Sequence, residues 1–392
     1  MTVDHLIRSM EIRNAGKGAE IQRGSNRDHA NFKQPARNPR AAAAEETGVI
    51  HFLRPPSRLA ALVPALGAIG WLAFAVAGTS CAPPSFDTSG AAGNGSGLPV
   101  ELRVQPDDGP PPIATLIRAA TRTVALEIYL LTDDQVIAAL VDAATAGRAV
   151  TVVIEPHPFG AETANRGAHD RLQAAGVDVV WSSARFALTH TKLLVVDGQE
   201  AVLMTCNLTH AGLTTNREFA VVDQAPADVA AAQAMIAADR NDTATAAPGG
   251  RLLSAPENAR ASLLALIDGA QSQLDVEMEE LSDAGVVAAL ANATAAGVAL
   301  TVVAPAADQS SATKSALARL VAAGVRVRTV GAPAVHAKAI VADHRRLYVG
   351  SVNLTAASMD HNREVGIIVD DSTAAARVSA TIAADAAAGA PP

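Results

Sequence analysis

The chain has 392 residues, enough for about two domains. Hydrophobic residues make up 49% but aromatic residues only 3%, so a large core must consist mostly of Val, Leu, Ile and Ala. Beyond residue 81, 21 Lys+Arg stand against 33 Asp+Glu, a net charge of −12. This acidic body lacks the broad basic surface that drives nucleic-acid binding, so nucleic acid is the less favoured partner. Two cysteines form neither a disulfide framework nor a recognisable metal site.

The first 98 residues differ in composition from the rest of the chain. Residues 1–50 are polar and lack hydrophobic periodicity, which predicts a disordered or over-extended N-terminus. Residues 51–81 hold an arginine flank, an apolar uncharged run at 59–77, small residues and then Cys81. This order is typical of a lipoprotein signal, with Cys81 as the lipidation candidate, or of a membrane anchor. After a linker at 82–98, we expect a domain that is secreted or held at the extracytoplasmic face of the cell membrane.

Strands and helices alternate after the linker, in two successive series. The first series predicts strands at 124–130, 149–154, 177–181, 192–196, 201–205 and 218–222, and helices at 134–146, 166–175 and 227–238. A linker at 244–251 follows. The second series predicts strands at 274–278, 299–303 and 325–329, and helices at 261–270, 284–296, 313–323 and 372–388. The alternation indicates α/β layers in two repeats, 99–243 and 252–392.

One unusual phrase of polar residues occurs once in each repeat, with every member displaced by 146 positions. The first copy contains His190, Lys192, Asp197, Thr205, Asn207 and Glu218, and the second contains His336, Lys338, Asp343, Ser351, Asn353 and Glu364. Further upstream, residues 138–140 match residues 288–290 at an offset of 150. A small gap in the alignment of the two repeats must therefore lie between this segment and the phrase. A repeat that keeps these residue types in step suggests two half-sites that meet in one active site.

The residue types of the phrase suit chemistry at a phosphodiester. Alternate residues of a strand point to the same side, so His190 and Lys192 project together, as do His336 and Lys338. Histidine offers a nucleophile or a proton near neutral pH, and lysine offers a positive charge for a phosphoryl oxygen. A downstream glutamate can hold the histidine ring in one tautomer. Two sets supply one histidine to attack and one to protonate the leaving group.

The second copy, His336-x-Lys338-x4-Asp343-x6-Gly350-Ser351-x-Asn353, resembles the full signature of the phospholipase D superfamily. The resemblance implies two similar phospholipase D-like α/β sandwich domains in tandem, related by a pseudo-two-fold axis, with the active site at their interface. It also implies a covalent phosphohistidine and a reaction that needs neither a metal nor another cofactor.

The same resemblance assigns expected roles to the residues of the phrase. His190 is the expected nucleophile and His336 the expected general acid, although the opposite assignment stays open. Glu218 and Glu364 are expected to orient the two histidines. The remaining expectations are that the phosphate is bound by Lys192, Lys338, Asn207, Asn353, Thr205 and Ser351, and that Asp197 and Asp343 are structural.

The first copy departs from the signature at 204–207, where Met-Thr-Cys-Asn replaces Gly-Ser-x-Asn. Met204 is bulkier than glycine, which predicts crowding of the pocket or a changed substrate. Cys206 is predicted to be a small buried residue. Glu127 and Glu277 occupy like positions and are expected either to line the cleft or to lie on the surface, and the acidic run 277–280 is expected to be a solvated rim.

The leading hypothesis is a phosphodiesterase of phospholipase D type, acting on a phospholipid as a monomer. Water as acceptor gives phosphatidic acid and a free head group, and an alcohol gives transphosphatidylation. The alternatives are a nuclease of the same superfamily, a cardiolipin-synthase-like transferase and an inactive phosphate-binding relative.

Overall fold

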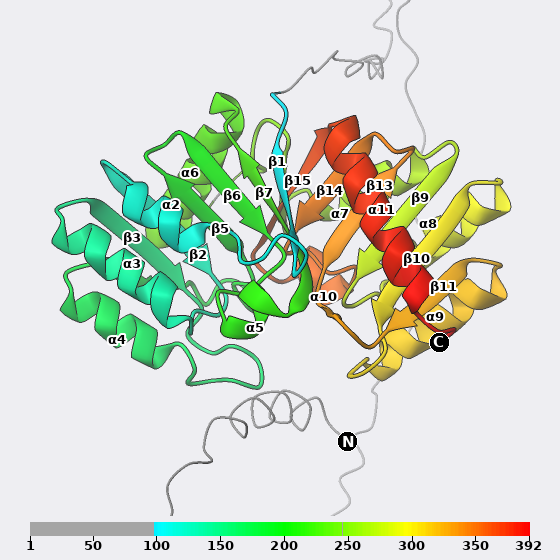
Figure 1. Cartoon of the computed structure of the whole chain (residues 1–392), viewed down its shortest axis with the longest axis horizontal. Helices are drawn as coiled ribbons and strands as arrows, with labels where there is room; N and C mark the ends of the chain where they lie inside the picture. The colour runs from blue at the N-terminus through cyan, green and yellow to red at the C-terminus, as the bar shows by residue number, and fades with distance from the viewer. Residues whose placement is uncertain (1–97, 245) are drawn as a thin grey trace, which may run out of the picture. The chain divides into compact units, whose positions relative to one another are not determined.

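The computed structural model describes residues 98–244 and 246–392 (Figure 1). All of these residues belong to one compact unit. The predicted N-terminus at 1–50, the signal-like segment with Cys81 and nearly all of the linker lie outside the described residues. Within the described part of the chain, no helix combines the length and the apolar character needed to cross a bilayer.

Each repeat builds one mixed sheet. The first repeat contains β1 (Glu101–Gln105), α2 (Ile113–Ala119), β2 (Thr123–Ile128), α3 (Asp134–Thr145), β3 (Ala149–Ile154), α4 (Arg166–Ala174), β4 (Asp178–Trp181), β5 (Lys192–Val196), β6 (Glu200–Met204), α5 (His210–Thr214), β7 (Asn216–Asp223) and α6 (Pro226–Arg240). Its strands are ordered β1-β7-β6-β5-β2-β3-β4. Neighbouring β2, β3 and β4 are parallel, and β5, β6, β7 and β1 are antiparallel to their neighbours.

The second repeat follows the same plan. It contains β8 (Leu252–Ala255), α7 (Ala259–Asp268), β9 (Gln273–Met278), α8 (Ala284–Ala295), β10 (Ala299–Pro305), α9 (Ser311–Ala322), β11 (Arg326–Val330), β12 (Ala334–Val335), β13 (Lys338–Ala342), β14 (Arg346–Gly350), α10 (Ala356–Asp360), β15 (Glu364–Asp370) and α11 (Ser372–Ala388). Its sheet has the order β11-β10-β9-β13-β14-β15-β8. The equivalent order of the two sheets confirms the predicted tandem α/β repeats.

Matching signals in the sequence begin and end the helices that flank each sheet. Asp133 caps α3 by accepting the N–H groups of Gln135 and Val136, and Asp283 caps α8 in the same way. Gly147 and Gly297 follow these helices with φ of +85° and +95°, a left-handed conformation that favours glycine. The chain then turns directly into β3 or β10, so the predicted helices at 134–146 and 284–296 agree with α3 and α8 to one residue.

Three hydrophobic clusters make up the core. One lies on the face of the first sheet covered by α2, α3 and α4, and a second lies on the corresponding face of the other sheet, under α7, α8 and α9. The third combines residues of both sheets with α6 and α11. Central strands such as β5 are buried along their whole length, because they contribute to two clusters at once. The shared third cluster joins the two repeats.

The repeats also exchange backbone contacts beside the motif histidines. Strand β12 belongs to the second repeat but pairs in parallel with the start of β7 in the first sheet. The N–H of His336 donates to the carbonyl of Arg217 at 3.2 Å, and the N–H of His190 donates to the carbonyl of Arg363 at 2.8 Å. The segment before each motif histidine therefore lies along the Asn-Arg-Glu segment of the opposite repeat.

The shift from an offset of 150 to one of 146 occurs in two steps. Strands β3 and β10 begin 150 residues apart, helices α4 and α9 end 148 apart, and β5 and β13 begin 146 apart. The segments between β3 and the end of α4 and between β4 and β5 are thus each longer in the first repeat. Both of these segments begin at the end of the sheet where the motif histidines lie.

Candidate active site

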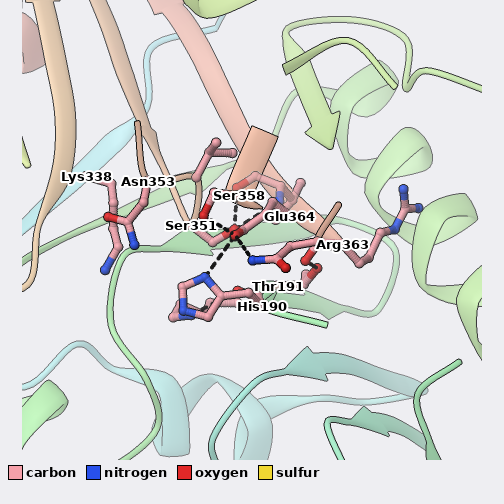
Figure 2. Close-up of polar contacts among 12 residues, drawn as sticks. His190, Thr191, Lys338, Ser351, Asn353, Ser358, Arg363 and Glu364 are labelled. Carbon is pink, nitrogen blue, oxygen red and sulfur yellow. Dashed lines mark hydrogen bonds and ion pairs between the residues drawn. The ribbon is translucent and has the colours of Figure 1, made fainter. Parts of the chain in front are cut away.

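His190 lies just before β5 and contacts a carboxylate from the other repeat. Its Nδ1 is 2.9 and 3.1 Å from the two carboxylate oxygens of Glu364, at the start of β15 (Figure 2). Glu364 also accepts from the hydroxyl of Ser358 at 2.8 Å and from the amide of Asn362 at 3.3 Å. Burial lowers the pKa of His190, against the opposing effect of Glu364. With Nδ1 fixed on the carboxylate, Nε2 is the nitrogen left for chemistry.

His336 is held by the equivalent contact, from a glutamate of the first repeat. Its Nδ1 is 2.7 Å from Oε1 of Glu218 in β7 of the first repeat, an ion-pair contact without hydrogen-bond geometry. Glu218 is fully buried, and its other oxygen accepts from the hydroxyl of Thr205 at 2.5 Å. The side chain of His336 remains 18% exposed, so its ring reaches the solvent-accessible part of the site. Each glutamate therefore orients the histidine of the opposite repeat, which makes the site a property of both halves.

Two lysines lie beneath the histidines. Lys192 and Lys338 are both fully buried, and each ammonium donates to the carbonyl of its own motif histidine, at 2.9 and 2.7 Å. Lys338 also forms an ion pair of 2.6 Å with Glu279. Burial, followed by the charge of Lys338, lowers the pKa of Lys192 to about 7. Lys192 is therefore only partly charged at neutral pH.

The two sides of the site differ at one pair of equivalent positions, Tyr129 and Glu279. The N–H of each residue donates to the carbonyl of the middle residue of the adjacent His-x-Lys, at 3.0 and 2.9 Å. The Tyr129 ring meets the ring of His190 edge-on, with 4.6 Å between centroids, and Lys192 Nζ lies 5.1 Å from its centre. In contrast, Oε1 of Glu279 is 3.6 Å from Nε2 of His336. One histidine thus faces an aromatic ring and the other a carboxylate.

The charges around Glu279 keep it ionised. Its burial acts to raise the pKa, but the positive charges of His336 and Lys338 outweigh that effect and hold the pKa below its ordinary value. The side chain is 29% exposed, whereas its partner Lys338 is fully covered. Glu279 therefore contributes a permanent negative charge at the open side of the site.

Of the two asparagines predicted to bind phosphate, Asn353 contacts a residue of the site. The amide of Asn353 donates to Oε2 of Glu279 at 3.3 Å and its oxygen accepts the N–H of Glu280 at 3.2 Å; Figure 2 shows Asn353 beside Lys338. The side-chain oxygen of Asn207 is buried and accepts no hydrogen bond from the described residues. The asparagine of the second repeat is therefore already bonded to a carboxylate.

The two predicted hydroxyls occupy a different place from the expected one. Thr205 and Ser351 are fully buried. The hydroxyl of Thr205 bonds to Glu218 and to the N–H of Phe219, and that of Ser351 donates to the carbonyl of Val365 at 3.2 Å and accepts its N–H at 3.0 Å. They lie behind the orienting carboxylates rather than at the open side. This placement differs from the phosphate contact predicted for Thr205 and Ser351.

The motif aspartates anchor turns. Asp197 lies in the β5–β6 turn with φ of 55°, and its carboxylate accepts the N–H groups of Thr121, Arg122 and Thr123 at 2.7 to 2.9 Å. Asp343 accepts the N–H groups at 271–273 in the same way. Each aspartate thus ties the turn after the catalytic strand to the start of the neighbouring strand, in keeping with the structural role expected for them.

Met204 lies in the core rather than in the pocket. It is fully buried among residues of the cluster under α2, α3 and α4, so the predicted crowding of a solvent-accessible pocket is not observed. Its equivalent, Gly350, has no room for a side chain, because a Cβ there would lie 2.5 Å from Cα of Gly366. The ring of Tyr348 packs closely at this point of the second repeat. Cys206 is also fully buried, as predicted.

Two expectations for the acidic residues beside the motif are wrong: the surface position that was one alternative for Glu127 and Glu277, and the solvated rim at 277–280. Glu127 and Glu277 are fully buried, so neither is a surface residue, and burial raises the pKa of both. Glu279 belongs to the site and not to a solvated rim. The sequence held one signal for the position of Glu279: at the offset of 150 it is equivalent to Tyr129, which lies in the strand predicted at 124–130.

Comparison with known proteins matches both repeats to one family. The profile of a family described as "Cardiolipin synthase, PLD-like domain" matches residues 113–240 and 263–386. A polyphosphate kinase of Xylella fastidiosa is 41% identical over 68 residues, which cover 17% of this chain and only 10% of that protein.

Two solved structures share the fold. Polyphosphate kinase from Porphyromonas gingivalis superposes with a TM-score of 0.57 at 18% identity, covering 72% of this chain and 50% of that one. Phosphatidylserine synthase from Haemophilus influenzae Rd KW20 gives a TM-score of 0.55 at 11% identity, covering 72% and 86%. At these identities the likeness concerns the arrangement of the two sheets and their helices.

Proposed function

Because the chain belongs to the family of phospholipase D-like domain proteins, which are phosphoryl-transfer enzymes, we propose that it is a phosphodiesterase of phospholipase D type. Its substrate is a phospholipid, and its products are phosphatidic acid and a free head group. The observation that carries this proposal is the crossed pair of His–Glu contacts, 2.9 Å for His190–Glu364 and 2.7 Å for His336–Glu218, above two buried lysines.

The surroundings of the two histidines support different roles. Burial favours the neutral imidazole of His190, and a neutral Nε2 has the lone pair that a nucleophile needs. His336 is the more exposed of the two, 18% against 12%, and its Nε2 lies 3.6 Å from Glu279 at the open side of the site, where a leaving group can take its proton. We therefore assign His190 as the nucleophile and His336 as the acid.

The reaction has two steps. Nε2 of His190 attacks phosphorus, the bond from phosphorus to the head-group oxygen breaks, and His336 gives its proton to that oxygen. Water then gives a proton to His336 while its oxygen attacks phosphorus, and the phosphorus–nitrogen bond breaks to release phosphatidic acid. Lys192 and Lys338 stabilise the charge that develops on the phosphoryl oxygens.

A lipid substrate is supported by the charge of the chain. The part beyond residue 81 carries −12, and only three lysines occur there, two of them inside the site. A polyanionic strand finds little to bind on such a body. We also propose that the N-terminal segment associates the protein with the membrane, at the extracytoplasmic face, and that the protein acts as a monomer.

The test is an assay of residues 82–392 in EDTA against phosphatidylcholine and a single-stranded oligonucleotide. Release of choline that is abolished in His190→Ala and in His336→Ala is the expected result. Cleavage of the oligonucleotide alone would make the protein a nuclease. Exchange of head groups with little hydrolysis would make it a transferase of the cardiolipin-synthase kind, and equal turnover by wild type and His190→Ala would reduce it to a phosphate-binding relative.

A further inference from the structure

The carboxylate of Glu279 contacts the side chains that a phosphoryl group would need as partners. Its Oε2 is 2.6 Å from Nζ of Lys338 and 3.3 Å from the amide of Asn353, and its Oε1 is 3.6 Å from Nε2 of His336. A lysine, an asparagine amide and a histidine are the three donors that the second motif offers to phosphate oxygens. Glu279 therefore stands in the place of substrate oxygens, and a phosphodiester has to displace it from Lys338.

The displaced carboxylate needs a new partner. Lys338 is fully buried, so its ammonium cannot bind a phosphate and Glu279 at the same time unless the site rearranges. Lys192 lies under the ring of Tyr129 and offers little charge above neutral pH. Glu279 pairs with Lys338, and Glu218 and Glu364 contact the two histidines, so three carboxylates already share the site with the two lysines. An anionic substrate would therefore leave Glu279 with an uncompensated charge in a partly buried position, which is costly.

A substrate that carries its own cation avoids this cost. Glu279 adjoins His336, the residue assigned to protonate the leaving oxygen, so it lies where the leaving group departs. In an amino-alcohol phosphodiester two carbons separate that oxygen from the ammonium, a short span comparable with the 3.6 Å between His336 Nε2 and Glu279 Oε1. The equivalent residue on the nucleophile side is Tyr129, which has no charge to offer. Of these two equivalent positions, Glu279 is the one that carries a charge able to bind a cation.

We propose that Glu279 is a specificity-determining residue, which binds the ammonium of the leaving group and so selects zwitterionic phosphodiesters over anionic ones. The proposal rests on the proposed function for the identity of the leaving-group side. It assigns the substrate to lipids whose head group is an amino alcohol.

The experiment measures binding and turnover separately. Binding of dihexanoyl-phosphatidylcholine and dihexanoyl-phosphatidylglycerol is followed by calorimetry in the His190→Ala protein, which cannot form the covalent intermediate. The same two lipids are bound to the His190→Ala, Glu279→Gln double variant, in which the side chain keeps its shape and loses its charge. Glu162→Gln, which removes one exposed loop carboxylate, is the matched control. Turnover is measured with Glu279→Gln alone.

Opposite changes for the two lipids are expected. Glu279→Gln should weaken binding of the choline lipid by about tenfold or more, the size of one favourable charged contact, and should strengthen binding of the glycerol lipid. Tighter binding of both lipids would make Glu279 a simple competitor for phosphate and would overturn the proposal. Equal weakening, no change, or wild-type preference for the glycerol lipid would also overturn it. Failure of the proposed function appears separately, as selective binding without release of either head group.

Discussion

At the scale of single residues, the two motif histidines are alike in their Nδ1 contacts and different in the side chain that lies beside the ring. Each Nδ1 faces a buried glutamate from the opposite repeat. Beside them, His190 meets the edge of Tyr129 and His336 meets the carboxylate of Glu279. In the proposed mechanism, the nucleophile and the acid therefore differ in their neighbours and not in the residues of the repeated phrase.

Replacement of Glu364 by glutamine tests the orienting contact. The variant keeps the size of the side chain but loses the charge that stabilises and positions the imidazole of His190. We expect kcat to fall by about 10²- to 10⁴-fold, as for the acid of a hydrolase triad, with little change in KM. Steady-state kinetics on the folded variant measures this, with Glu162→Gln as the control. Unchanged kcat would show that the 2.9 Å contact has no catalytic role.

The charge of Lys192 predicts a pH dependence of anion binding. Since burial, and then Lys338, lowers its pKa to about 7, the ammonium is charged below that pH and neutral above it. The inhibition constant of sulfate, whose own charge is constant there, should rise between pH 7 and pH 9. Lys192→Arg stays protonated and should flatten the rise. The same midpoint in the arginine variant would assign the titration to another group.

Residue-level reasoning from the sequence predicted which residues meet in the candidate site but not how they are paired. The register of the phrase identified both histidines, both lysines and both glutamates. It did not show that Glu218 serves His336 and Glu364 serves His190, because that crossing depends on the pairing of β12 with β7 and of Thr189 with Arg363. Glu279 was assigned to the surface because an acidic run on its own gives no sign of a nearby buried lysine.

At the scale of elements, each catalytic strand is fixed at its far end by a motif aspartate. Asp197 and Asp343 each accept three successive backbone N–H groups from the segment that leads into β2 or β9. These strands carry Tyr129 and Glu279 at their ends. The aspartate therefore sets the register between the motif and the residue beside it.

Asp343→Asn should weaken the fold. Burial acts to raise the pKa of Asp343, but the N–H and hydroxyl donors at 271–273 outweigh it and lower the pKa to about 2. A lowered pKa means that the stabilisation is complete above about pH 4 and is lost as the pH falls towards 2. We expect the free energy of unfolding at pH 7 to drop by about 1 to 3 kcal/mol. Urea unfolding measures this, and an equal loss at pH 2 would contradict it.

Met204→Ala tests the place of Met204 in the core. Removing a fully buried side chain leaves a cavity under α2, α3 and α4, which should lower the free energy of unfolding by about 2 to 5 kcal/mol. Because Met204 has no exposed surface in the site, kcat per folded molecule should stay within about twofold, at the accuracy of such comparisons. Thermal unfolding and kinetics are measured on the same preparation. A large gain in activity would restore the prediction that Met204 crowds the pocket.

The periodic helices and the central strands were predictable, and the edge strands were not. Helix α11 and the central strand β5 have the predicted bounds, since a long periodic segment and a run of four buried apolar residues leave little choice. Strands β1 and β8 were missed. Each is short and lies at a sheet edge, held by pairing with β7 or β15, so its structure depends on a partner distant in sequence.

At the scale of the whole molecule, the Arg-Glu pair of each repeat performs two tasks. While Glu364 reaches His190, the neighbouring Arg363 is buried and pairs with Asp239 of α6 in the first repeat at 2.7 Å. Arg217, beside Glu218, pairs with Asp385 of α11 in the second repeat at 2.6 Å. Two buried ion pairs thus fix the repeats to each other at the residues that complete the site.

Arg363→Ala should be severely destabilising. It leaves Asp239 without its buried cation, close to Glu127, so we expect a loss of about 3 to 5 kcal/mol in the free energy of unfolding. Arg345→Ala removes an exposed arginine paired with Asp370 and should leave the free energy of unfolding nearly unchanged. Chemical unfolding of both variants decides the comparison. Similar small losses would mean that Arg363 does not hold the repeats together.

The most direct test of the central claim is to trap the covalent intermediate. The protein is mixed with short-chain phosphatidylcholine labelled at phosphorus, quenched in alkali, digested and mapped. The shared site predicts alkali-stable label on the peptide that contains His190, absent in His190→Ala and reduced in Glu364→Gln, whose changed residue lies in the other repeat. Label on His336, or no labelled histidine while head group is released, would contradict this assignment.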